Sequence, residues 1–477
     1  MQNCQRIVIA CLAAMVLSGC ATRKYRPAPI SGEASASGFE ARRLDDPGLR
    51  QFMEANARQK PSSWPQKTWD LETLTLTAFY FHPDLEVARA RVAASEAAVV
   101  TAGARPNPAI RVAPGTTNSP ESPWLFGFSF DLLIETAGKR GYRMKRAASL
   151  SEAARLDLGN EAWKVRSRLR SKFADHLIAT FERDLVRRQE KILTERVSLL
   201  RARLQVGEIP RPEVDAAQIE LSNTRLALRA AEGRVNETRA SLAATVGVAV
   251  AALDGVDLVW PDFEQPPSLQ SLSAEKIQRE AVLNRLDVQR ALAEYAAADT
   301  GVRLEIARQY PDITLGPGYD FDEGHSKFSV GVGVTLPVFN RNQGPIAEAE
   351  AHRKEAGASF LATQAHVIAE SERALAQYQA AERQLAEADQ TLMTLQAAQE
   401  RLAGRALALG EADRLAWNGV LLQSAAAATA RLEALRRAQT GLGALEDALQ
   451  RPLAPAAPVP QVTSSEAQKA AGKELRK

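Results

Sequence analysis

Few residues of this chain have the types and spacing that catalysis requires. The nearest approach to a phosphate-binding loop is Ala137-Gly138-Lys139-Arg140, but the first Gly of that loop and the Ser or Thr after Lys are missing. The chain has no Gly-x-Ser-x-Gly nucleophile turn and no His-Glu-x-x-His zinc motif. We therefore expect a protein that is not an enzyme.

The residues that could bind a metal are equally scattered. Of the five His residues, His352 and His366 could share a helix face, but two such residues are more simply solvated. Outside the N-terminal segment, three Met residues are dispersed along the chain, too few for a thioether relay. We expect no metal site, and we expect no cofactor other than a covalent lipid. The evidence for that lipid lies in the N-terminal segment that contains the Cys residues.

The three Cys residues all lie at the extreme N-terminus. Arg6 precedes an apolar run, and Leu17-Ser18-Gly19-Cys20 follows it, which is the form of a cleaved signal. The tetrapeptide resembles the bacterial lipobox, so Cys20 is expected to become the first residue and to carry a lipid. Two residues after Cys20, Thr22 stands in place of an Asp, which resembles lipoproteins sent to the outer membrane. The alternative is an ordinary secretory signal with an incidental Cys.

The composition favours long helices. Aromatic residues make up 6% of the chain, and Ala, Arg, Glu, Leu and Gln are abundant. A formal net charge of +3 leaves no basic footprint of a nucleic-acid-binding protein. No stretch after the signal reaches the roughly eighteen apolar residues of a spanning helix. If this protein crosses a membrane, it must do so with β-strands.

Two long helical hairpins dominate the pattern. Residues 142–204 form a helical pattern without Pro, a rod of roughly 95 Å at about 1.5 Å per residue. After a turn at 207–212, apolar residues recur at strict sevens, as in a coiled coil. These seam residues are Val214, Leu221, Leu228, Val235 and Leu242. A second hairpin begins near Ile346 and turns after Leu409.

A pair of strands precedes each hairpin. Apolar residues alternate with small or polar ones at 110–112 and 125–134, and again at 313–319 and 328–339. A strand-to-helix junction follows each pair. Its residues are Gly138, Lys139 and Arg140 in the first copy, and Pro337, Asn340, Arg341 and Gly344 in the second. Pro337 suits a bend where the ladder ends, and Gly138 and Gly344 are expected to open the two rods.

The two halves of the chain are copies of one unit. Asp84 aligns with Asp287, Arg105 with Arg308 and Gly207 with Gly410, each pair 203 residues apart. Six segments follow from this alignment. They are a lipoprotein signal (1–19), a lipid-anchored arm (20–68), a first repeat (69–246), a connecting segment (247–271), a second repeat (272–451) and a disordered tail (452–477).

Four strands per chain cannot close a sheet by themselves. A membrane-spanning sheet must be closed, and the smallest closed ones have about eight strands. Several chains must therefore contribute to one β-barrel. We expect a mainly α fold with a membrane β-barrel contribution, in which the antiparallel coiled-coil hairpins extend the barrel as a helical tube and the whole forms a conduit.

These features resemble the TolC-type outer membrane factor family across residues 69–451. The resemblance rests on the two repeats, on Pro106-Asn107-Pro108 and Tyr310-Pro311-Asp312 before the strands, and on the Gly-Glu helix turns. It implies a homotrimer with a twelve-stranded β-barrel and an α-helical periplasmic tunnel, in the outer membrane of a Gram-negative bacterium. Its implied partners are outer membrane lipid, a periplasmic adaptor and an inner-membrane pump.

Two hexapeptides resemble the CzcC-like branch of that family. They are Glu135-Thr136-Ala137-Gly138-Lys139-Arg140 and Phe339-Asn340-Arg341-Asn342-Gln343-Gly344. That branch works with heavy-metal exporting pumps of the resistance-nodulation-division type, which implies heavy-metal cations as the substrate. Sister branches share the fold, so a duct for organic compounds or drugs is the alternative.

The resemblance also implies roles for the helix turns. Val206-Gly207-Glu208 and Leu409-Gly410-Glu411 would form the periplasmic tip that contacts the adaptor, although the reversal of a helix explains each Gly by itself. Some family members close the tip with carboxylate rings, but the corresponding positions here are Ala416 and Gly419. Glu213, Asp215 and Asp413 are candidate substitutes in a pore gate; solvation is the simpler role for each.

An alternative of another class is a periplasmic coiled-coil adaptor or scaffold. The paired alternating strands argue against it, because an adaptor would carry lipoyl-like or barrel modules between its helix halves. A hydrolase is a third hypothesis, and no motif in the sequence supports it.

Overall fold

The computed structural model describes residues 24–57, 63–118, 123–268, 274–322 and 324–453. The expected signal, the expected lipid site Cys20 and the tail from residue 454 onward lie outside these described residues. The chain divides into two compact units, Met1–Arg42 and Arg43–Lys477. The described part of the first unit contains α2 (Gly32–Glu40), which Ser31 caps by accepting a hydrogen bond from the backbone N–H of Ala34.

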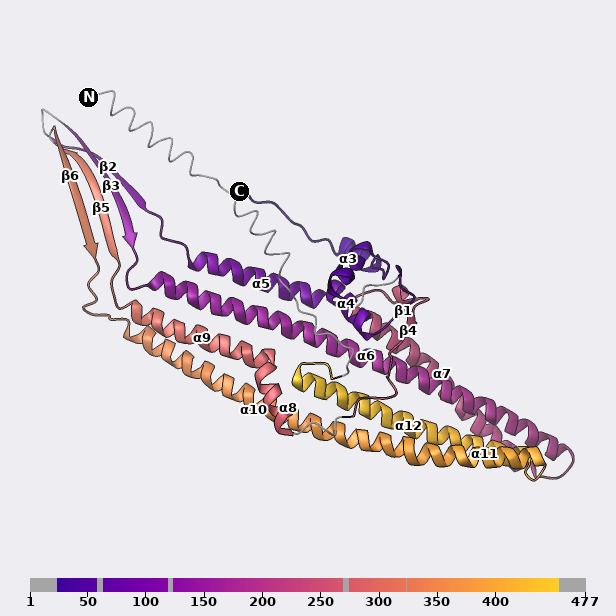
Figure 1. Ribbon diagram of the computed structural model, residues 1–477. Helices are drawn as coiled ribbons and strands as arrows, with labels where there is room; N and C mark the ends of the chain where they lie inside the picture. The colour runs from indigo at the N-terminus through magenta and orange to yellow at the C-terminus, as the bar shows by residue number, and fades with distance from the viewer. Residues whose placement is uncertain (1–23, 58–62, 119–122, 269–273, 323, 454–477) are drawn as a thin grey trace. The chain divides into compact units, whose positions relative to one another are not determined.

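The second unit contains two successive sets of elements in the same order, a helix pair, a strand pair and a helical hairpin (Figure 1). The first set is α4 (Leu71–Phe81), α5 (Pro83–Ala102), β2 (Ala109–Thr116), β3 (Trp124–Ile134), α6 (Lys139–Gln205) and α7 (Arg211–Val246). The second set is α8 (Ala274–Asn284), α9 (Leu286–Ala307), β5 (Ile313–Asp322), β6 (His325–Val334), α10 (Gln343–Glu387), the π-helical turn η2 (Ala388–Leu392), α11 (Met393–Leu409) and α12 (Arg414–Leu449).

Shorter elements lie outside these two sets. They are α3 (Pro47–Asn56), β1 (Thr68–Trp69), η1 (Val250–Leu253) and β4 (Asp257–Leu258). β1 and β4 pair in parallel, which ties the chain before the first set to the segment that connects the two sets.

Local sequence signals explain where the helices start and stop. Asp70 and Thr73 form a capping box at the start of α4, each side chain accepting from the other residue's backbone N–H. Pro83 then begins α5, because Pro is favoured in the first turn and cannot continue a helix. Gly247 ends α7 in the left-handed conformation that Gly adopts without strain.

The two strand pairs join in one antiparallel sheet of order β2-β3-β5-β6. The sheet lies at one end of the second unit, and the turns of the two hairpins lie at the opposite end (Figure 1). β6 ends at Val334, before the predicted strand end at Phe339, because its pairing with β5 begins at Ile313. All four predicted strands are present, but β2 continues to Thr116, β5 continues to Asp322 and β6 already begins at His325.

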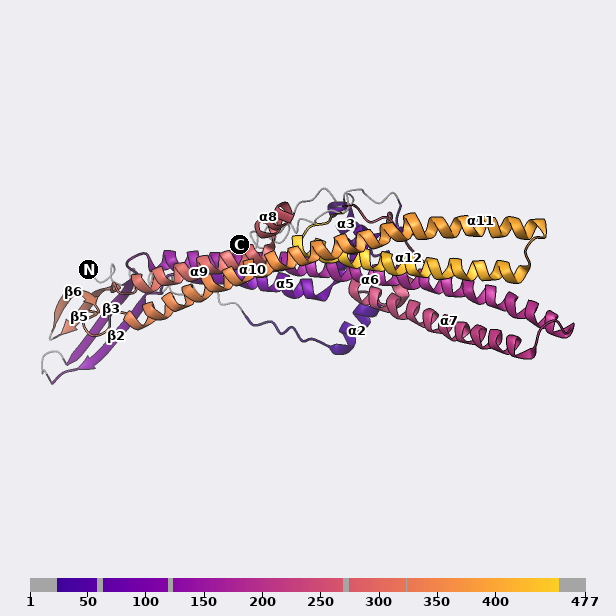
Figure 2. The same ribbon diagram turned by 90° about the horizontal axis from the view of Figure 1, so that it is seen from below.

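The helix α6 is the spine of the second unit. It has 67 residues, or about 100 Å at about 1.5 Å per residue. Near the sheet, the helices pack in the order α5-α6-α9-α10, and near the turns in the order α7-α6-α12-α11 (Figure 2). Two helices therefore form the free edges of the layer at each level.

The largest described core lies where α3 and α4 cover α6 and α7. Leu49 and Met53 of α3 are fully buried there, beside Leu74, Leu169 and Phe173. Burying a side chain of this size contributes about 1.5–3 kcal/mol. The arm expected up to residue 68 therefore includes a helix that belongs to the core.

The predicted coiled-coil seam of α7 is buried only in part. Val214, Leu221 and Leu242 are buried against α6, whereas Leu228 and Val235 are half-buried. Apolar residues of the second rod recur at three- and seven-residue steps, and they divide in the same way. Leu375, Tyr378 and Leu385 are buried, whereas Leu361, Leu395 and Leu402 are exposed.

Candidate functional site

One face of the sheet is apolar along all four strands. The register sets Val112 opposite Phe128, Phe128 opposite Tyr319, and Tyr319 opposite Phe328. Because side chains alternate along a strand and paired residues share a face, the apolar face continues from β2 to β6. Its members include Ile110, Val112, Phe126, Phe128, Phe130, Leu132, Leu315, Tyr319, Phe328, Val330, Val332 and Val334. Phe328 is 83% exposed, so this face is suited to an apolar surrounding.

The opposite face of the sheet is small and charged. Arg111 pairs with Asp131 at 3.3 Å, and Lys327 with Asp322 at 2.7 Å. A Cβ added to Gly127 would lie 2.9 Å from the Asp320 carboxylate, so a larger residue there would require the Asp320 side chain to shift. A sheet with one apolar and one charged face can separate lipid from water.

The first strand-to-helix junction is closed by ion pairs. Lys139 is buried, and its Nζ donates to the Asp312 carboxylate and to the Tyr310 carbonyl, both at 2.6 Å. Arg140 donates to the Gly103 carbonyl at 2.6 Å, and Arg143 pairs with Glu135. The junction thus ties the start of the first rod to the turn that precedes β5 in the second repeat.

The second junction is open. Pro337 is half-buried, whereas Asn340, Arg341 and Gly344 are exposed. Gly344 lies inside α10 and does not open the rod, contrary to the sequence-based expectation. The residue in the left-handed conformation is Asn342 (φ +63°), whose amide donates to the Glu305 carbonyl at 2.8 Å. Asn tolerates this conformation better than most residues, so the equivalent of Gly138 is Asn342.

Both hairpin turns contain a Gly in the left-handed conformation, Gly207 (φ +78°) and Gly410 (φ +75°). In each turn, the backbone N–H of the following Glu, Glu208 or Glu411, donates to a carbonyl five residues earlier, at 2.9 Å in both cases. This arrangement satisfies the last carbonyls of the incoming helix. Val206 and Leu409 are exposed at the turns.

The three candidate gate carboxylates lie in different surroundings. Asp413 caps α12 by accepting from the Ala416 N–H at 2.7 Å, and it pairs with Arg203 of the other hairpin at 2.7 Å. The Ala416 N–H, and after it Arg203, lower the pKa of Asp413 below its ordinary value. Asp215 lies 3.7 Å from Arg211 within α7, and Glu213 is exposed. Asp413 therefore joins the two hairpins, a contact that the sequence does not indicate.

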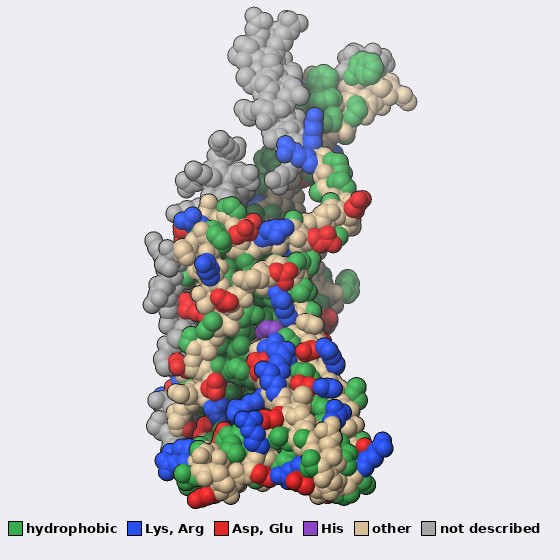
Figure 3. Space-filling model, turned by 90° about the vertical axis from the view of Figure 1, so that its right-hand side faces the viewer, with side chains coloured by type: hydrophobic (Ala, Val, Ile, Leu, Met, Phe, Trp, Pro, Cys, Tyr) green, Lys and Arg blue, Asp and Glu red, His purple; other side chains and the backbone are tan. Residues whose placement is uncertain are grey.

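The end of the molecule with the turns is rich in charge. Figure 3, viewed from that end, shows many Lys and Arg side chains with Asp and Glu among them. Arg414 pairs with Glu195 at 2.6 Å, which is a second ion pair between the hairpins beside that of Asp413.

A buried ionic network joins α6 to α12, and sequence reasoning missed it. Glu446 is 2% exposed, accepts a hydrogen bond from Arg166 at 3.1 Å and forms an ion pair with Arg170 at 3.2 Å. Burial lowers the pKa of Arg170 and the Glu446 charge acts against that effect. The available signal was a pair of Arg residues on the apolar face that carries Leu169 and Phe173.

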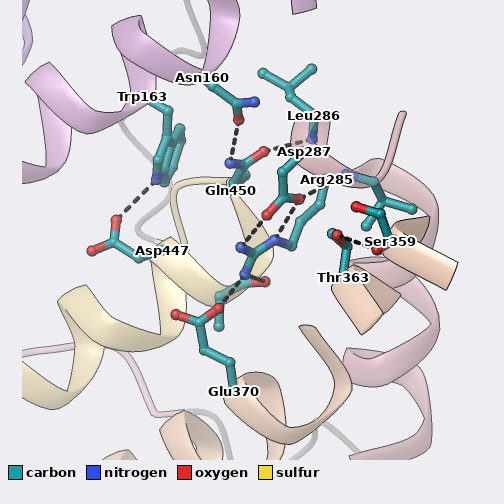
Figure 4. Close-up of polar contacts among 12 residues, drawn as sticks. Asn160, Trp163, Arg285, Leu286, Asp287, Ser359, Thr363, Glu370, Asp447 and Gln450 are labelled. Carbon is teal, nitrogen blue, oxygen red and sulfur yellow. Dashed lines mark hydrogen bonds and ion pairs between the residues drawn. The ribbon is translucent and has the colours of Figure 1, made fainter. Parts of the chain in front are cut away.

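A neighbouring polar cluster holds the start of α9 (Figure 4). Arg285 pairs with Asp287 and with Glu370, both at 2.6 Å, and donates to the Ala448 carbonyl at 3.3 Å. Trp163 donates to Asp447 at 2.9 Å. Burial raises the pKa of Asp447, although the bonds from Ser167 and Trp163 oppose the rise.

The two edges of the helical layer near the turns carry unpartnered apolar stripes. On α7 they are Ile219 and Leu226, seven residues apart, and Leu226 is 70% exposed. On α11 they are Leu395, Leu402 and Leu409, also at sevens. Seven-residue spacing keeps the side chains on one side of a helix, so each stripe is suited to a partner helix.

Within the described ranges, no helix has both the length and the apolar character needed to cross a membrane. Across the same residues, no cluster of three or more His, Cys, Asp and Glu residues is arranged to hold a metal ion.

Residues 80–248 and 277–450 match the protein family described as "Outer membrane efflux protein". The two matched stretches correspond to the two sets of elements, and the connecting segment lies between them.

Three curated relatives are similar to parts of this chain. The cobalt-zinc-cadmium resistance protein CzcC of Cupriavidus metallidurans is 26% identical over 285 residues, which cover 58% of this chain and 65% of that protein. The pyoverdine export outer membrane protein OpmQ of Pseudomonas putida is 27% identical over 220 residues, 43% of this chain and 45% of that protein. The probable outer membrane lipoprotein SilC of Salmonella typhimurium is 25% identical over 191 residues, which cover 36% of this chain and 41% of that protein. Each match covers less than two thirds of the relative's length.

Solved structures show the same fold over most of the chain. The outer membrane protein VceC from Vibrio cholerae has a TM-score of 0.64 and 21% identity, covering 80% of this chain and 97% of that one. The structure of CusC has a TM-score of 0.65 and 16% identity, and the match covers 90% of this chain and 99% of the CusC chain. The predicted mainly helical fold with strand pairs is thereby confirmed.

Proposed function

The chain belongs to the outer membrane efflux protein family, whose members are channels rather than enzymes, and from this premise we propose that it is the outer membrane duct of a tripartite efflux system. In this proposal the chain passively conducts substrate from an inner-membrane pump and a periplasmic adaptor to the exterior. The observation that carries it is the sheet with one apolar and one charged face.

The edges of the sheet require further copies of the chain. β2 and β6 each have one unpaired side within the sheet, and lipid cannot satisfy open backbone groups. We propose that three copies close one sheet, with the β6 edge of one copy pairing with the β2 edge of the next. Each copy would contribute four strands to the closed sheet.

The helical layer supports the same assembly. The apolar stripes of α7 and α11 lie on opposite edges of one chain, so the α7 stripe of one copy can pack against the α11 stripe of the next. Such a head-to-tail contact closes into a ring when the rotation between copies is suitable. The hairpins would then form the wall of a periplasmic tunnel.

The mass of the detergent-extracted protein, measured by light scattering, tests this assembly. We expect a trimer from outer membranes, and we expect Leu226→Asp or Leu402→Asp to shift the mass toward the monomer, because each places a charge in a buried contact. Ala227→Asp, at an exposed position of α7 outside the face that carries Ile219 and Leu226, is the matched control and keeps the trimer. A soluble monomer would contradict the duct and favour the periplasmic scaffold.

For the substrate, we propose heavy-metal cations. The similarity to CzcC, a cobalt-zinc-cadmium resistance protein, supports this choice, as does the presence of Asp131, Asp320 and Asp322 on the charged face of the sheet. The similarity to OpmQ, a pyoverdine exporter, supports the alternative of organic compounds. Deleting the gene should sensitise cells to cobalt, zinc or cadmium. Hypersensitivity confined to organic toxins would defeat the metal assignment.

The lipid on Cys20 is a further part of the proposal, supported by the similarity to SilC, a probable outer membrane lipoprotein. Labelled palmitate should be incorporated into the wild-type chain and not into Cys20→Ser.

We also propose that the adaptor contacts the two hairpin turns, at Gly207-Glu208 and Gly410-Glu411. The exposure of these turns supports that contact.

Glu213, Asp215 and Asp413 are proposed as a pore gate, and the conductance of the channel in a lipid bilayer tests it. Unchanged closure in Glu213→Ala and Asp413→Ala would remove both residues from the gate.

A further inference from the structure

The apolar stripe of β6 continues beyond the end of the strand. Phe328, Val330, Val332 and Val334 occupy every second position of the ladder, and Leu336 and Val338 continue that spacing after the ladder has ended. Leu336 is 73% exposed, and Phe339, which directly follows Val338, is 98% exposed. The loop 335–342 therefore prolongs the face that the proposed function assigns to lipid.

An open hollow lies where this apolar loop meets α10. It has a volume of about 500 Å³, which is within the usual range of small-molecule sites. Phe339 and Arg341 of the loop line it, together with Gln309 before β5 and one face of α10. The α10 residues in its lining are Gln343, Ile346, Ala347 and Glu350, whose spacing places them on one side of the helix.

The polar side chains of this hollow are unpaired. Within the described residues, the Arg341 guanidinium, the Gln309 amide and the Glu350 carboxylate make no hydrogen bond or ion pair. The Gln343 side-chain oxygen accepts from the Arg341 backbone N–H at 2.8 Å, which leaves its amide nitrogen as a donor. At the first junction, by contrast, Lys139 and Arg140 are both bonded within the protein.

We propose that this hollow binds the headgroup of a zwitterionic phospholipid of the phosphoethanolamine type, an inference that rests on the proposed location in the outer membrane. Arg341 and the amides of Gln309 and Gln343 supply donors for the phosphate. Glu350 supplies an acceptor for the ammonium group. Leu336, Val338 and Phe339 lie beside the acyl chains, continuous with the apolar face of the sheet.

Two observations favour a lipid over a second copy of the chain as the occupant. The hollow combines one cationic and one anionic side chain, which matches the two charges of this headgroup. It also lies at the boundary where an exposed apolar stripe ends and an exposed polar helix begins, which is where headgroups lie in a bilayer.

The test is native mass spectrometry of full-length trimers released from nanodiscs that contain equal amounts of phosphatidylethanolamine and phosphatidylglycerol. Wild-type trimers should retain phosphatidylethanolamine in preference. Arg341→Ala should lower the retention of both lipids about tenfold, because it removes charge-assisted hydrogen bonds to the shared phosphate. Glu350→Gln should lower only the retention of phosphatidylethanolamine. Arg105→Ala, an exposed Arg that precedes β2 in the first repeat, is the control and leaves retention unchanged.

The possible outcomes separate this inference from the proposed function. Trimers that form in nanodiscs but retain lipid equally in wild type and Arg341→Ala would overturn the headgroup site and leave the duct intact. A loss of trimer mass in Arg341→Ala, with unchanged lipid retention per chain, would assign the hollow to a second copy and also overturn the site. A chain that neither enters nanodiscs nor assembles would overturn both.

Discussion

The two strand-to-helix junctions occupy equivalent places in the two repeats, yet they are stabilised in opposite ways. The first is closed, because Lys139 reaches Asp312 and Tyr310 of the other repeat. The second is open, because Arg341 is exposed and the loop is joined to α9 by the hydrogen bonds of Asn342 with Glu305.

This difference shows that the same order of elements can be fixed either by internal pairing or by the surroundings. At the first junction a buried cation must find its partner within the chain, since an unpaired buried charge is strongly unfavourable. At the second junction the charges face outward, so water, lipid or another chain must complete them. The closed junction should therefore be sensitive to mutation in the isolated protein, and the open one should not.

The largest expected effect is at Lys139. Lys139→Met keeps the length of the side chain but leaves the Asp312 carboxylate and the Tyr310 carbonyl without this donor, so we expect a loss of about 3 kcal/mol in the free energy of unfolding. Arg341→Met at the open junction should change it by less than about 0.5 kcal/mol. Denaturant unfolding in one detergent, at one protein concentration, compares them. Equal losses would break the distinction between the junctions.

A smaller effect distinguishes the residues that open the rods. Gly138 has a φ of +73°, so Gly138→Ala should cost about 1–2 kcal/mol, because L-residues are strained in this conformation. Gly344 does not have a positive φ, and a Cβ there meets open space apart from its chain neighbours. However, Pro345 disfavours the helical conformation for a preceding residue with a Cβ, so Gly344→Ala should change the stability by less than about 0.5 kcal/mol. Thermal unfolding of the two variants checks this. Destabilisation by Gly344→Ala as large as that by Gly138→Ala would return that residue to the role that the sequence predicted for it.

The smallest effect concerns the turn end of the molecule. The folded-state pKa of Asp413 lies below its ordinary value, so its ionised form contributes stability above the ordinary pKa that is lost as the pH falls through the folded pKa. Asp413→Asn keeps a helix cap and removes the charge that pairs with Arg203.

We therefore expect this variant to be less stable than wild type at neutral pH, with a difference that begins to shrink near the ordinary pKa of about 4 and disappears once the pH falls below the lowered folded-state pKa. Stability measured as a function of pH, with Asp215→Asn as the matched control, checks it. A difference that persists in acid would show that the ion pair with Arg203 is not its cause.

Much of the fold could be predicted because its determinants are local. Alternation marked the strands, seven-residue spacing marked the hairpins, and Gly207 and Gly410 marked turns that the structure confirms. The repeat itself was visible as recurring residues 203 positions apart. Such signals depend on neighbours along the chain, and they need no knowledge of tertiary contacts.

The candidate sites were less predictable because their partners are distant in sequence. Lys139 and Asp312 lie in different repeats, as do Arg203 and Asp413, and no local pattern connects them. Asn342 replaced Gly344 at the start of the rod because a side chain that tolerates the left-handed conformation can do the work of a glycine. The helix α3 was hidden in a segment whose Pro, Ser and charge content is typical of a tether.

The ionic network between α6 and α12 occupies a seam that lies within one chain. The position of Glu446 corresponds in the first repeat to Ala243, 203 residues earlier, so the carboxylate exists in one copy of the duplicated unit only. Because Arg166, Arg170 and Glu446 belong to one chain, their pairing does not depend on the protein concentration, and these buried charges are neutralised before any second copy binds.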